Sequence, residues 1–558
     1  LFLVIMQEDL LEAFRTPLFF VYISMLLSFC VASGSQLGDR VELEFHAYRL
    51  QQYEVAGSII GSKSFRVLYE AVGIDAAAAR KCTMASWRDL INRDLESLFK
   101  TAVGSLIVVL PADYSALSPA ERKSLIDLET LLSITQTELS VYAIRWSESA
   151  AALLADVSST STVSTGMQQL LHAVTSNTFQ LTSATTSVPA SITYKPKNII
   201  TRLSGSSHNS PTIVFVAHYD THSAFPDLGD GTDSNGSGVV ALLELLSILK
   251  RFYDRPATRP NYHMLFVWTA AGKHNYQGAR SFIEELQDKY PDDKLELALC
   301  LDSIGQGDSL NVHLSKVPNE GTVVDRFIRY LRAASINQTI DVIAKKINLQ
   351  QPFAWEHERF NVKRLPSITL SHLSVPSEIT RRSIMDSTVD TTVLSRNVRT
   401  IAEATLSLIL SLPERASHKD ERVSSESSLL SPHAINKERL SQLVCIYLYL
   451  IMLDKMIQLS RIASHPRPLS SQSSTEECAS NIASLATTYG HTSQHIVQLE
   501  TTVVPSSIER ILAEKTKPAI FDLFLAGGIA VYLALFMRIT LSSQSILEGV
   551  LTTLRKSN

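Results

Sequence analysis

Cysteines and basic runs are scarce in this sequence, and each scarcity excludes a class of protein. The 558 residues include only five cysteines, which are too widely spaced for a small disulfide-built scaffold. No stretch is rich in lysine and arginine, and the formal net charge of −4 gives no basic surface for nucleic acid. The chain is instead rich in apolar residues, at 45%, which is enough to fill the core of one large domain or two ordinary ones.

Residues 17–32 form an apolar run near the start of the chain and indicate a signal peptide. The run has about 16 residues, which is short for a membrane span but typical of the apolar core of a signal peptide. Small residues follow at Ala32, Ser33 and Gly34, where cleavage would occur. The flank before the run is acidic rather than basic, which leaves a retained N-terminal anchor as the alternative. We expect residues 1–33 to be a removed signal peptide.

A second apolar run, residues 519–537, predicts a membrane-spanning helix near the other end. At about 1.5 Å per residue it nearly crosses a hydrocarbon core of about 30 Å, and its apolar residues cover every face, unlike those of an amphipathic helix. Asp522 interrupts the run in its first turn, where it would reach the interface or pair with a partner helix. Together with the signal peptide, this span predicts a single-pass type I membrane protein whose tail, residues 538–558, is cytosolic.

The remainder of the chain is expected to be lumenal. Residues 34–195 mix helical patterns with one apolar strand at 105–111 and reveal little of their role. Residues 416–512 begin with a Ser-rich linker and include an apolar run, 443–453, which is too short to span a membrane and predicts a buried helix. Asn337 begins the triplet Asn-Gln-Thr, which predicts N-glycosylation in the lumen.

Residues 196–415 have the most regular pattern, in which apolar strands alternate with amphipathic helices. This order predicts an α/β domain with a mostly parallel sheet that helices cover on both faces. The expected strands are 212–220, 262–269, 295–305 and 365–371, and the expected helices are 236–253, 278–286 and 394–410. Binding sites in such folds form at the carboxyl ends of the strands. His218, Asp220, Lys273 and Asp302 all fall at expected strand ends.

Four short motifs follow one another along this domain: VAHYD at 216–220, DSNGSG at 233–238, CLDSIG at 300–305 and HERFNVKRLPSI at 357–368. In this order and on these elements, they resemble the landmarks of the aminopeptidase and glutamate carboxypeptidase clan of zinc peptidases. The resemblance implies an aminopeptidase-like fold. It also implies a site for two zinc ions, with one free carboxylate that deprotonates the water between them.

The resemblance gives metal-site roles to four residues. His218 and Asp302 would bind one zinc ion, Asp233 would bridge to the second, and Asp220 would orient His218. Taken singly, each has an ordinary explanation as a buried histidine, a helix-capping aspartate or a turn aspartate. The ordered set is what makes the interpretation specific.

Three positions depart from the pattern of the clan. The stretch AGKHNYQGA at 271–279 places Gly272 where the clan has its general base and Lys273 where it has a ligand of the second metal. Asp386, in DSTVD, stands where the last ligand is a histidine. The resemblance therefore implies a pseudoenzyme that lacks the general base and one metal site. It implies no cofactor, apart from a single residual zinc ion that the remaining ligands would still allow.

The charge of Lys273 offers a physical explanation for the loss of a metal ligand at its position. Its ammonium would neutralise Asp233 and Asp302, which would otherwise repel each other in a desolvated cleft. The alternative is that Lys273 points to solvent and the cleft is a passive remnant.

Within the clan, the chain resembles the nicalin family through AHYD, DSNGSGV, the Gly-Lys pair ahead of NYQG, and the C-terminal span. This implies a non-catalytic, nicastrin-like glycoprotein of the endoplasmic reticulum membrane. Its partners would be a Nodal-modulator protein and a small multi-spanning membrane protein, in a complex that meets the Sec translocon and the ribosome indirectly. The complex would assist insertion of multi-pass membrane proteins, with further roles in Nodal signalling and receptor assembly. Two alternatives stay open: an active lumenal zinc aminopeptidase or related hydrolase, and a receptor that binds peptide ends without cutting them.

Overall fold

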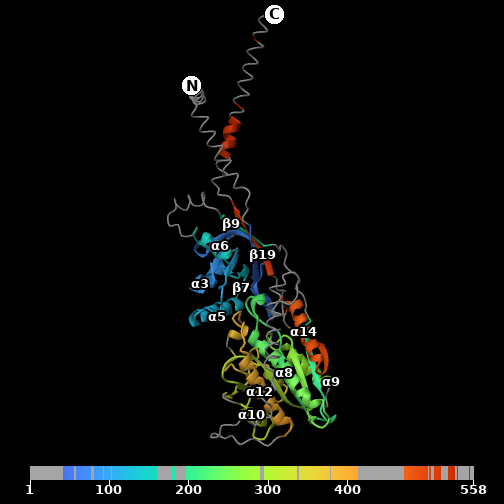
Figure 1. The fold of residues 1–558 in the computed structure, drawn as a ribbon. Helices are drawn as coiled ribbons and strands as arrows, with labels where there is room; N and C mark the ends of the chain where they lie inside the picture. Colours follow the sequence, from blue (N-terminus) through green and yellow to red (C-terminus); the bar gives the residue numbers. More distant parts are fainter. Residues whose placement is uncertain are drawn as a thin grey trace.

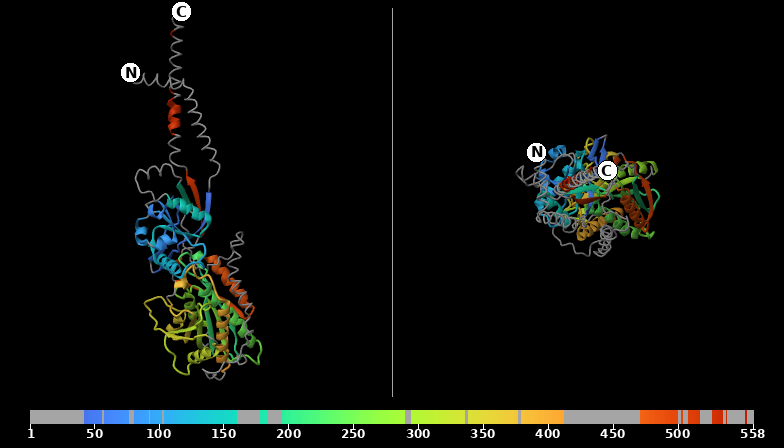
Figure 2. Two further views of the ribbon diagram at one scale, coloured as in Figure 1. Left: turned by 60° about the vertical axis from the view of Figure 1, so that its left-hand side comes forward. Right: turned by 90° about the horizontal axis from the view of Figure 1, so that it is seen from above.

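Two sets of strands organise the chain into a small barrel and a larger α/β domain (Figure 1). The structure is a computed structural model. It describes residues 42–516 except 56–57, 77–80, 92, 102–103, 160–177, 184–194, 290–293, 336–337, 377–378, 412–470, 500–501 and 504–507, and it also describes 526–534, 537 and 552. Figure 2 shows the barrel stacked on one end of the α/β domain.

An eight-stranded sheet forms the centre of the α/β domain. From edge to edge its strands are β15 (Val342–Ala344), β14 (Asn311–Leu314), β16 (Ser367–Ser371), β13 (Leu295–Leu301), β11 (Thr212–His218), β12 (His263–Thr269), β10 (Lys197–Leu203) and β17 (His491–Ile496). The central strands β16, β13, β11 and β12 are parallel, whereas β14 is antiparallel to β16, and β10 is antiparallel to both of its neighbours. The sheet is therefore mixed rather than mostly parallel. The prediction was too simple because the apolar pattern of a strand does not reveal the direction in which it joins a sheet.

Alternation of side chains along the central strands explains why helices cover both faces. On β11, Ile213, Phe215 and Ala217 join the core on one face, whereas Val214 and Val216 join the core on the other. The first core is completed by α8 (Gly238–Tyr253), α10 (Val323–Ala334), α12 (Thr391–Ile409) and α14 (Gln472–Thr487). The second is completed by α9 (Gln277–Lys289) and α11 (His357–Val362).

The sequence predicted the central elements of this domain but not its edges. Strands β11, β12, β13 and β16 and helices α8, α9 and α12 all overlap the expected ranges. Strands β14, β15, β10 and β17 were not predicted. β15 and β17 are short or half-exposed, so neither has the continuous apolar run that marks a buried strand.

Seven strands close the smaller domain into a barrel. In order they are β1 (Glu42–Arg49), β19 (Ile508–Thr516), β9 (Thr178–Ser183), β4 (Leu68–Gly73), β5 (Cys82–Ser86), β6 (Ser105–Val109) and β8 (Ser140–Ile144). The helices of this domain are α3 (Trp87–Ile91), α4 (Leu95–Thr101), α5 (Pro119–Ile134) and α6 (Glu148–Ser159). A small sheet beside it contains β18 (Thr502–Val503), β2 (Tyr53–Val55), β3 (Ser58–Ser62) and β7 (Gln136–Thr137). Strand β6 confirms the apolar strand predicted at 105–111.

Segments from the C-terminal part of the chain contribute to both domains. α14 packs on the α/β domain, β17 pairs with the edge strand β10, and β19 pairs with β1 in the barrel. The barrel is thus completed by two strands that lie far apart in the sequence, and the pairing buries Ile511 and Ala513. The buried helix predicted at 443–453 lies outside the described residues.

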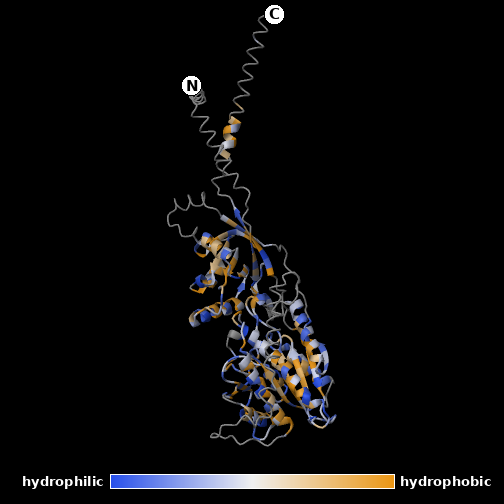
Figure 3. Cartoon of the chain, viewed as in Figure 1, coloured by the Kyte–Doolittle hydropathy of each residue, from blue (hydrophilic) through white to orange (hydrophobic). Residues whose placement is uncertain are grey.

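Across the described part of the chain, we find no helix with both the length and the apolar character that a membrane crossing needs. Of the expected span, residues 519–537, the structure describes 526–534 and 537, all helical (Figure 3). More than half of the surface is exposed on several large apolar side chains there: Ile529, Val531, Tyr532, Leu533 and Met537. The predicted signal peptide, Asp522, Asn337 and the predicted cytosolic tail, apart from residue 552, lie outside the described residues.

A single buried carboxylate, that of Glu129 on α5, ties the barrel to two loops of the α/β domain. It accepts hydrogen bonds from the amides of Ala224 and Ile384, both at 3.1 Å, and from the hydroxyl of Ser383 at 2.6 Å. Burial raises the pKa of Glu129 to about 7, although these hydrogen bonds oppose the rise. Glu129 therefore fixes both loops relative to the barrel.

Replacing Glu129 with alanine should destabilise the protein strongly. The change leaves three donors buried without an acceptor, so we expect the free energy of unfolding in urea to fall by about 2 to 4 kcal/mol. The matched control is Glu138→Ala, because that carboxylate is 79% exposed and pairs with Lys63 at the surface. The control should cost less than about 0.5 kcal/mol. Equal losses in the two variants would show that Glu129 does not fix the interface.

Candidate functional site

The predicted site residues lie in one buried cluster (the cleft) around the carboxyl ends of β11, β12 and β13. His218 is the last residue of β11, Lys273 lies in the loop after β12, and Asp302 follows β13. Asp233 lies in the short helix before α8, and Asp386 precedes α12. None of the five residues is more than 7% exposed.

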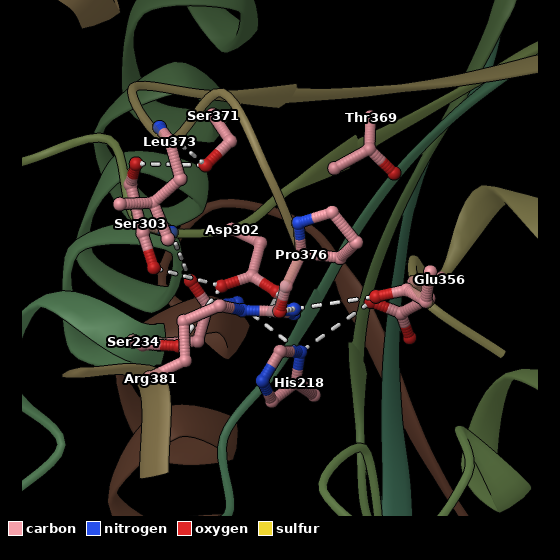
Figure 4. A network of polar contacts seen from close by, with 12 residues as sticks. His218, Ser234, Asp302, Ser303, Glu356, Thr369, Ser371, Leu373, Pro376 and Arg381 are labelled. Atoms are coloured by element: carbon pink, nitrogen blue, oxygen red, sulfur yellow. Dashed lines mark hydrogen bonds and ion pairs between the residues drawn. The ribbon is translucent and has the colours of Figure 1, made fainter. Parts of the chain in front are cut away.

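Asp302 is neutralised by an arginine that no motif in the sequence points to. The guanidinium of Arg381, in the 3₁₀ helix Ile379–Arg382, forms a buried ion pair with Oδ2 of Asp302 (Figure 4). The hydroxyls of Ser234 and Ser303 each donate to Oδ1 at 3.0 Å. Burial alone would raise the pKa of Asp302, but nearby positive charges, Arg381 first among them, together outweigh burial and hold that pKa below its ordinary value. Asp302 is therefore an ionised and fully paired carboxylate.

Arg381 is itself held from several sides. Its guanidinium carbon lies 4.3 Å from the ring centre of Trp355. It donates to the hydroxyl of Tyr276 at 2.9 Å and to the backbone carbonyls of Ala354 and Pro376 at 3.2 and 3.0 Å. The guanidinium is thus fixed in place by an aromatic face and three oxygen acceptors, in addition to the carboxylate it neutralises.

Lys273 is also buried, so it does not point to solvent. Its ammonium donates to the hydroxyl of Ser234 at 2.5 Å and to the backbone carbonyl of Arg381 at 2.9 Å. Because Ser234 in turn donates to Asp302, the ammonium reaches that carboxylate through one hydroxyl. Burial lowers the pKa of Lys273 to about 8, and the charge of Asp302 limits the fall. Arg381 thus contacts Asp302 directly, and Lys273 supports the pair from one hydroxyl away.

Asp233 and Asp386 are engaged in separate contacts. Nε2 of His372 donates to Oδ2 of Asp233 at 2.9 Å, and the amide of Gly305 donates to Oδ1 at 2.7 Å. The two oxygens of Asp386 accept the amides of Asp233 and Ser234, at 2.8 Å each. Burial and the charge of Asp233 raise the pKa of Asp386 to about 7. Asp386 therefore holds the backbone of the loop that carries Asp233.

The position of the general base is closed by close packing. Asp220, which the resemblance makes a partner of His218, accepts the amides of Gly272 at 2.6 Å and Lys273 at 3.0 Å. These bonds hold the loop after β12 against the end of β11. A Cβ atom on Gly272 would lie 2.2 Å from Cβ and 2.3 Å from Cγ of His218. The glutamate of the clan therefore has no room at this position unless the loop or His218 moves.

The arrangement does not fit a zinc ion. Nδ1 of His218 and Oε2 of Glu356 lie 3.6 Å apart, and Nε2 of His218 has no hydrogen-bond partner. The carboxylates that would complete a site, those of Asp233 and Asp302, already pair with other side chains. Within the described residues, no group of three His, Cys, Asp or Glu side chains is placed to hold a metal ion. The cleft offers compensated charges rather than a set of free metal ligands.

Three residues of the cleft, Arg381, Glu356 and His372, were not predicted from the sequence. Glu356 directly precedes the HERF motif, and its carboxylate accepts the hydroxyl of Thr269 at 2.6 Å. Arg381 and His372 come from the stretch after β16, where no motif marks them. The pair of adjacent arginines shortly before Asp386 is the one signal there.

Removing Arg381 should cost more stability than removing Lys273. Arg381→Met leaves Asp302 as a buried, unpaired charge, and we expect the free energy of unfolding in urea to fall by about 3 to 5 kcal/mol. Lys273→Met leaves the ion pair intact and should cost at most about 2 kcal/mol. Lys250→Met, which breaks a half-exposed pair with Asp254 at the end of α8, is the control and should be nearly neutral. A larger loss for Lys273→Met would contradict this order.

Asp386→Asn should change how stability depends on pH. A carboxyl whose pKa rises from 3.8 to about 7 on folding binds its proton more tightly when folded, so its contribution to stability falls as pH rises through that window. Relative to Asp386→Asn, the wild type should therefore lose on the order of 2 to 4 kcal/mol between about pH 4 and about pH 7 and change little above it. Urea unfolding at several pH values measures this difference. Asp308→Asn, at a position 99% exposed, should show no such trend, and a trend of opposite sign for Asp386→Asn would contradict the assignment.

Comparisons with known proteins show the family and the fold to which this site belongs. Residues 198–403 match peptidase family M28. Nicalin of Caenorhabditis elegans is 40% identical over 99% of this chain and 100% of its own length, and the human protein named BOS complex subunit NCLN is 32% identical over 95% and 94%. The structure of the gamma-secretase component nicastrin matches with a TM-score of 0.54 and 12% identity, covering 84% of this chain and 99% of nicastrin, which shows a shared fold. With such identity along nearly its whole length, the chain belongs to the nicalin family and carries an M28 peptidase-like domain.

Proposed function

We propose that this protein is a non-catalytic, membrane-anchored scaffold subunit of a complex in the endoplasmic reticulum. The observation that carries the proposal is that side-chain cations, rather than a metal ion, balance the charge of a buried carboxylate. Arg381 and Lys273 hold Asp302, while Gly272 packs directly against His218 where a base would stand. A cleft arranged in this way holds Asp302 neutralised without a metal ion, and Gly272, at the position of the base, has no side chain that could activate water.

The energetic argument against peptide hydrolysis has two parts. Loss of a general base typically costs about 10²- to 10⁴-fold in rate, and loss of a second metal removes further stabilisation of the transition state. A single substitution does not restore the base, because a side chain at Gly272 collides with His218. Among the described residues of the cleft, no contact therefore favours the alternative of an active zinc aminopeptidase or related hydrolase.

The names of its relatives support a role as a complex subunit. Relatives from dog, human, mouse and rat are named BOS complex subunit NCLN, at 31 to 32% identity. By similarity, we infer a role in the insertion of multi-pass membrane proteins, beside a Nodal-modulator protein and a small multi-spanning membrane protein. The contact of this protein with the Sec translocon and the ribosome would be indirect. Effects on Nodal signalling and receptor assembly would follow from the same complex.

The proposed location is the endoplasmic reticulum membrane, with residues 34–512 in the lumen. The exposed apolar side chains of helix 526–534 support residues 519–537 as the anchor. In this topology Asn337 carries glycan and the tail is cytosolic.

Affinity purification of the tagged full-length chain from detergent-solubilised microsomes tests the scaffold role. We expect the Nodal-modulator protein and a small multi-spanning protein to co-purify in comparable amounts. Changing both Ile529 and Leu533 to arginine should release the chain from the membrane and lose the multi-spanning partner, because each arginine costs about 2.5 to 3.5 kcal/mol at the centre of a span. Leu349→Arg, at a position 72% exposed on the α/β domain, is the control and should keep both.

The same preparation, supplied with zinc, should release no amino acid from aminopeptidase substrates. Zinc-dependent release that His218→Ala abolishes would overturn the non-catalytic assignment.

A further inference from the structure

The barrel domain contains a cavity that lies apart from the cleft. Its volume is about 580 Å³, within the range of about 300 to 1,000 Å³ that is typical of ligand sites. It lies where the parallel strands β5, β6 and β8 end, between the segment before α5 and helix α6. The carboxyl edge of parallel strands is where α/β folds commonly form binding sites.

Small and aromatic residues give this cavity its shape. Ala151 and Ala155 on α6 leave the hollow open on one side, while Trp87 and Leu110 line it from the protein core. Trp146 lies at the wall and is 46% exposed, whereas Trp87 is 2% exposed. A half-exposed indole beside an apolar hollow is typical of the residues that dominate binding at protein interfaces.

The charged groups around the cavity already have partners within this chain. Arg88 forms an ion pair with Glu121 at 2.8 Å and lies over the ring of Trp87 at 4.8 Å. Asp113 accepts hydrogen bonds from the amide and the hydroxyl of Ser115, both at 2.7 Å. Since Arg88 is paired and Asp113 is hydrogen-bonded within its own turn, the apolar side chains that line the cavity supply most of the surface it offers to a ligand.

We propose that this cavity receives apolar side chains from a lumenal segment of another subunit of the same complex. The inference rests on the proposed scaffold function, because a complex subunit must present surface to partner polypeptides. The place of the barrel supports it: in Figures 1 and 2 the barrel lies between the α/β domain and helix 526–534. A partner anchored in the same membrane would therefore meet the barrel before the α/β domain. Leucine, phenylalanine or methionine side chains match the apolar walls.

Two tryptophan substitutions on one helix test the proposal. Ala155→Trp fills the cavity, whereas Ala152→Trp adds the same side chain at an exposed position of α6 that does not line it. In full-length, membrane-derived complexes, Ala155→Trp should reduce recovery of one stoichiometric partner at least about tenfold. A tenfold loss of affinity corresponds to about 1.4 kcal/mol of binding free energy. Ala152→Trp should recover the wild-type amount, and both variants should unfold at the wild-type temperature. Trp146→Ala should reduce the same partner, and Trp146→Phe should restore most of it.

The outcomes separate this inference from the proposed function. If the wild type recovers its membrane partners and Ala155→Trp and Trp146→Ala recover them equally well, the cavity is not the docking site, while the scaffold function stands. If the wild type recovers no stoichiometric partner, both proposals fail. A photo-crosslinking residue at position 155 identifies the occupant: a crosslink to an apolar segment of the lost partner supports the inference, and a crosslink to lipid alone overturns it.

Discussion

The buried ion pair between Arg381 and Asp302 is the contact on which the cleft depends. Moving an isolated carboxylate into a protein interior costs several kcal/mol, so Asp302 requires a cation beside it. In a zinc peptidase of this fold a metal ion would supply that charge. Here a guanidinium supplies it, and Trp355, Tyr276 and backbone carbonyls keep it in place. Because Lys273 joins through Ser234, the two cations and Asp302 form one buried hydrogen-bonded network.

Contacts from both the small barrel and the α/β domain fix the positions of the residues in this network. The loop of Ser383 and Ile384 links Arg381 to Asp386, and Glu129 holds that loop from the barrel. Positions of cleft residues therefore depend on the barrel as well as on the α/β domain. The contact keeps the two domains fixed relative to each other, as the proposed scaffold role requires.

Whether a feature can be predicted from the sequence depends on how far apart along the chain its interacting residues lie. His218 and Asp302 could be placed because they follow apolar runs, and the ends of parallel strands meet in space. Arg381 could not, because it reaches Asp302 from 79 residues further along the chain and lies in a 3₁₀ helix of four residues, which is too short to leave a periodic pattern. The barrel was hidden for a similar reason: its closing strands, β1 and β19, come from opposite ends of residues 42–516. The local apolar pattern likewise does not reveal whether an edge strand runs parallel or antiparallel to its neighbour.

The central claim is that a guanidinium, rather than a metal ion, neutralises Asp302. X-ray diffraction at the zinc absorption edge, from crystals of the protein grown with excess zinc, tests it most directly. The account predicts no anomalous peak among His218, Asp233 and Asp302, and guanidinium density for Arg381 against the Asp302 carboxylate. A zinc peak about 2.0 to 2.2 Å from a nitrogen of His218 and an oxygen of Asp302, with Arg381 displaced, would contradict it.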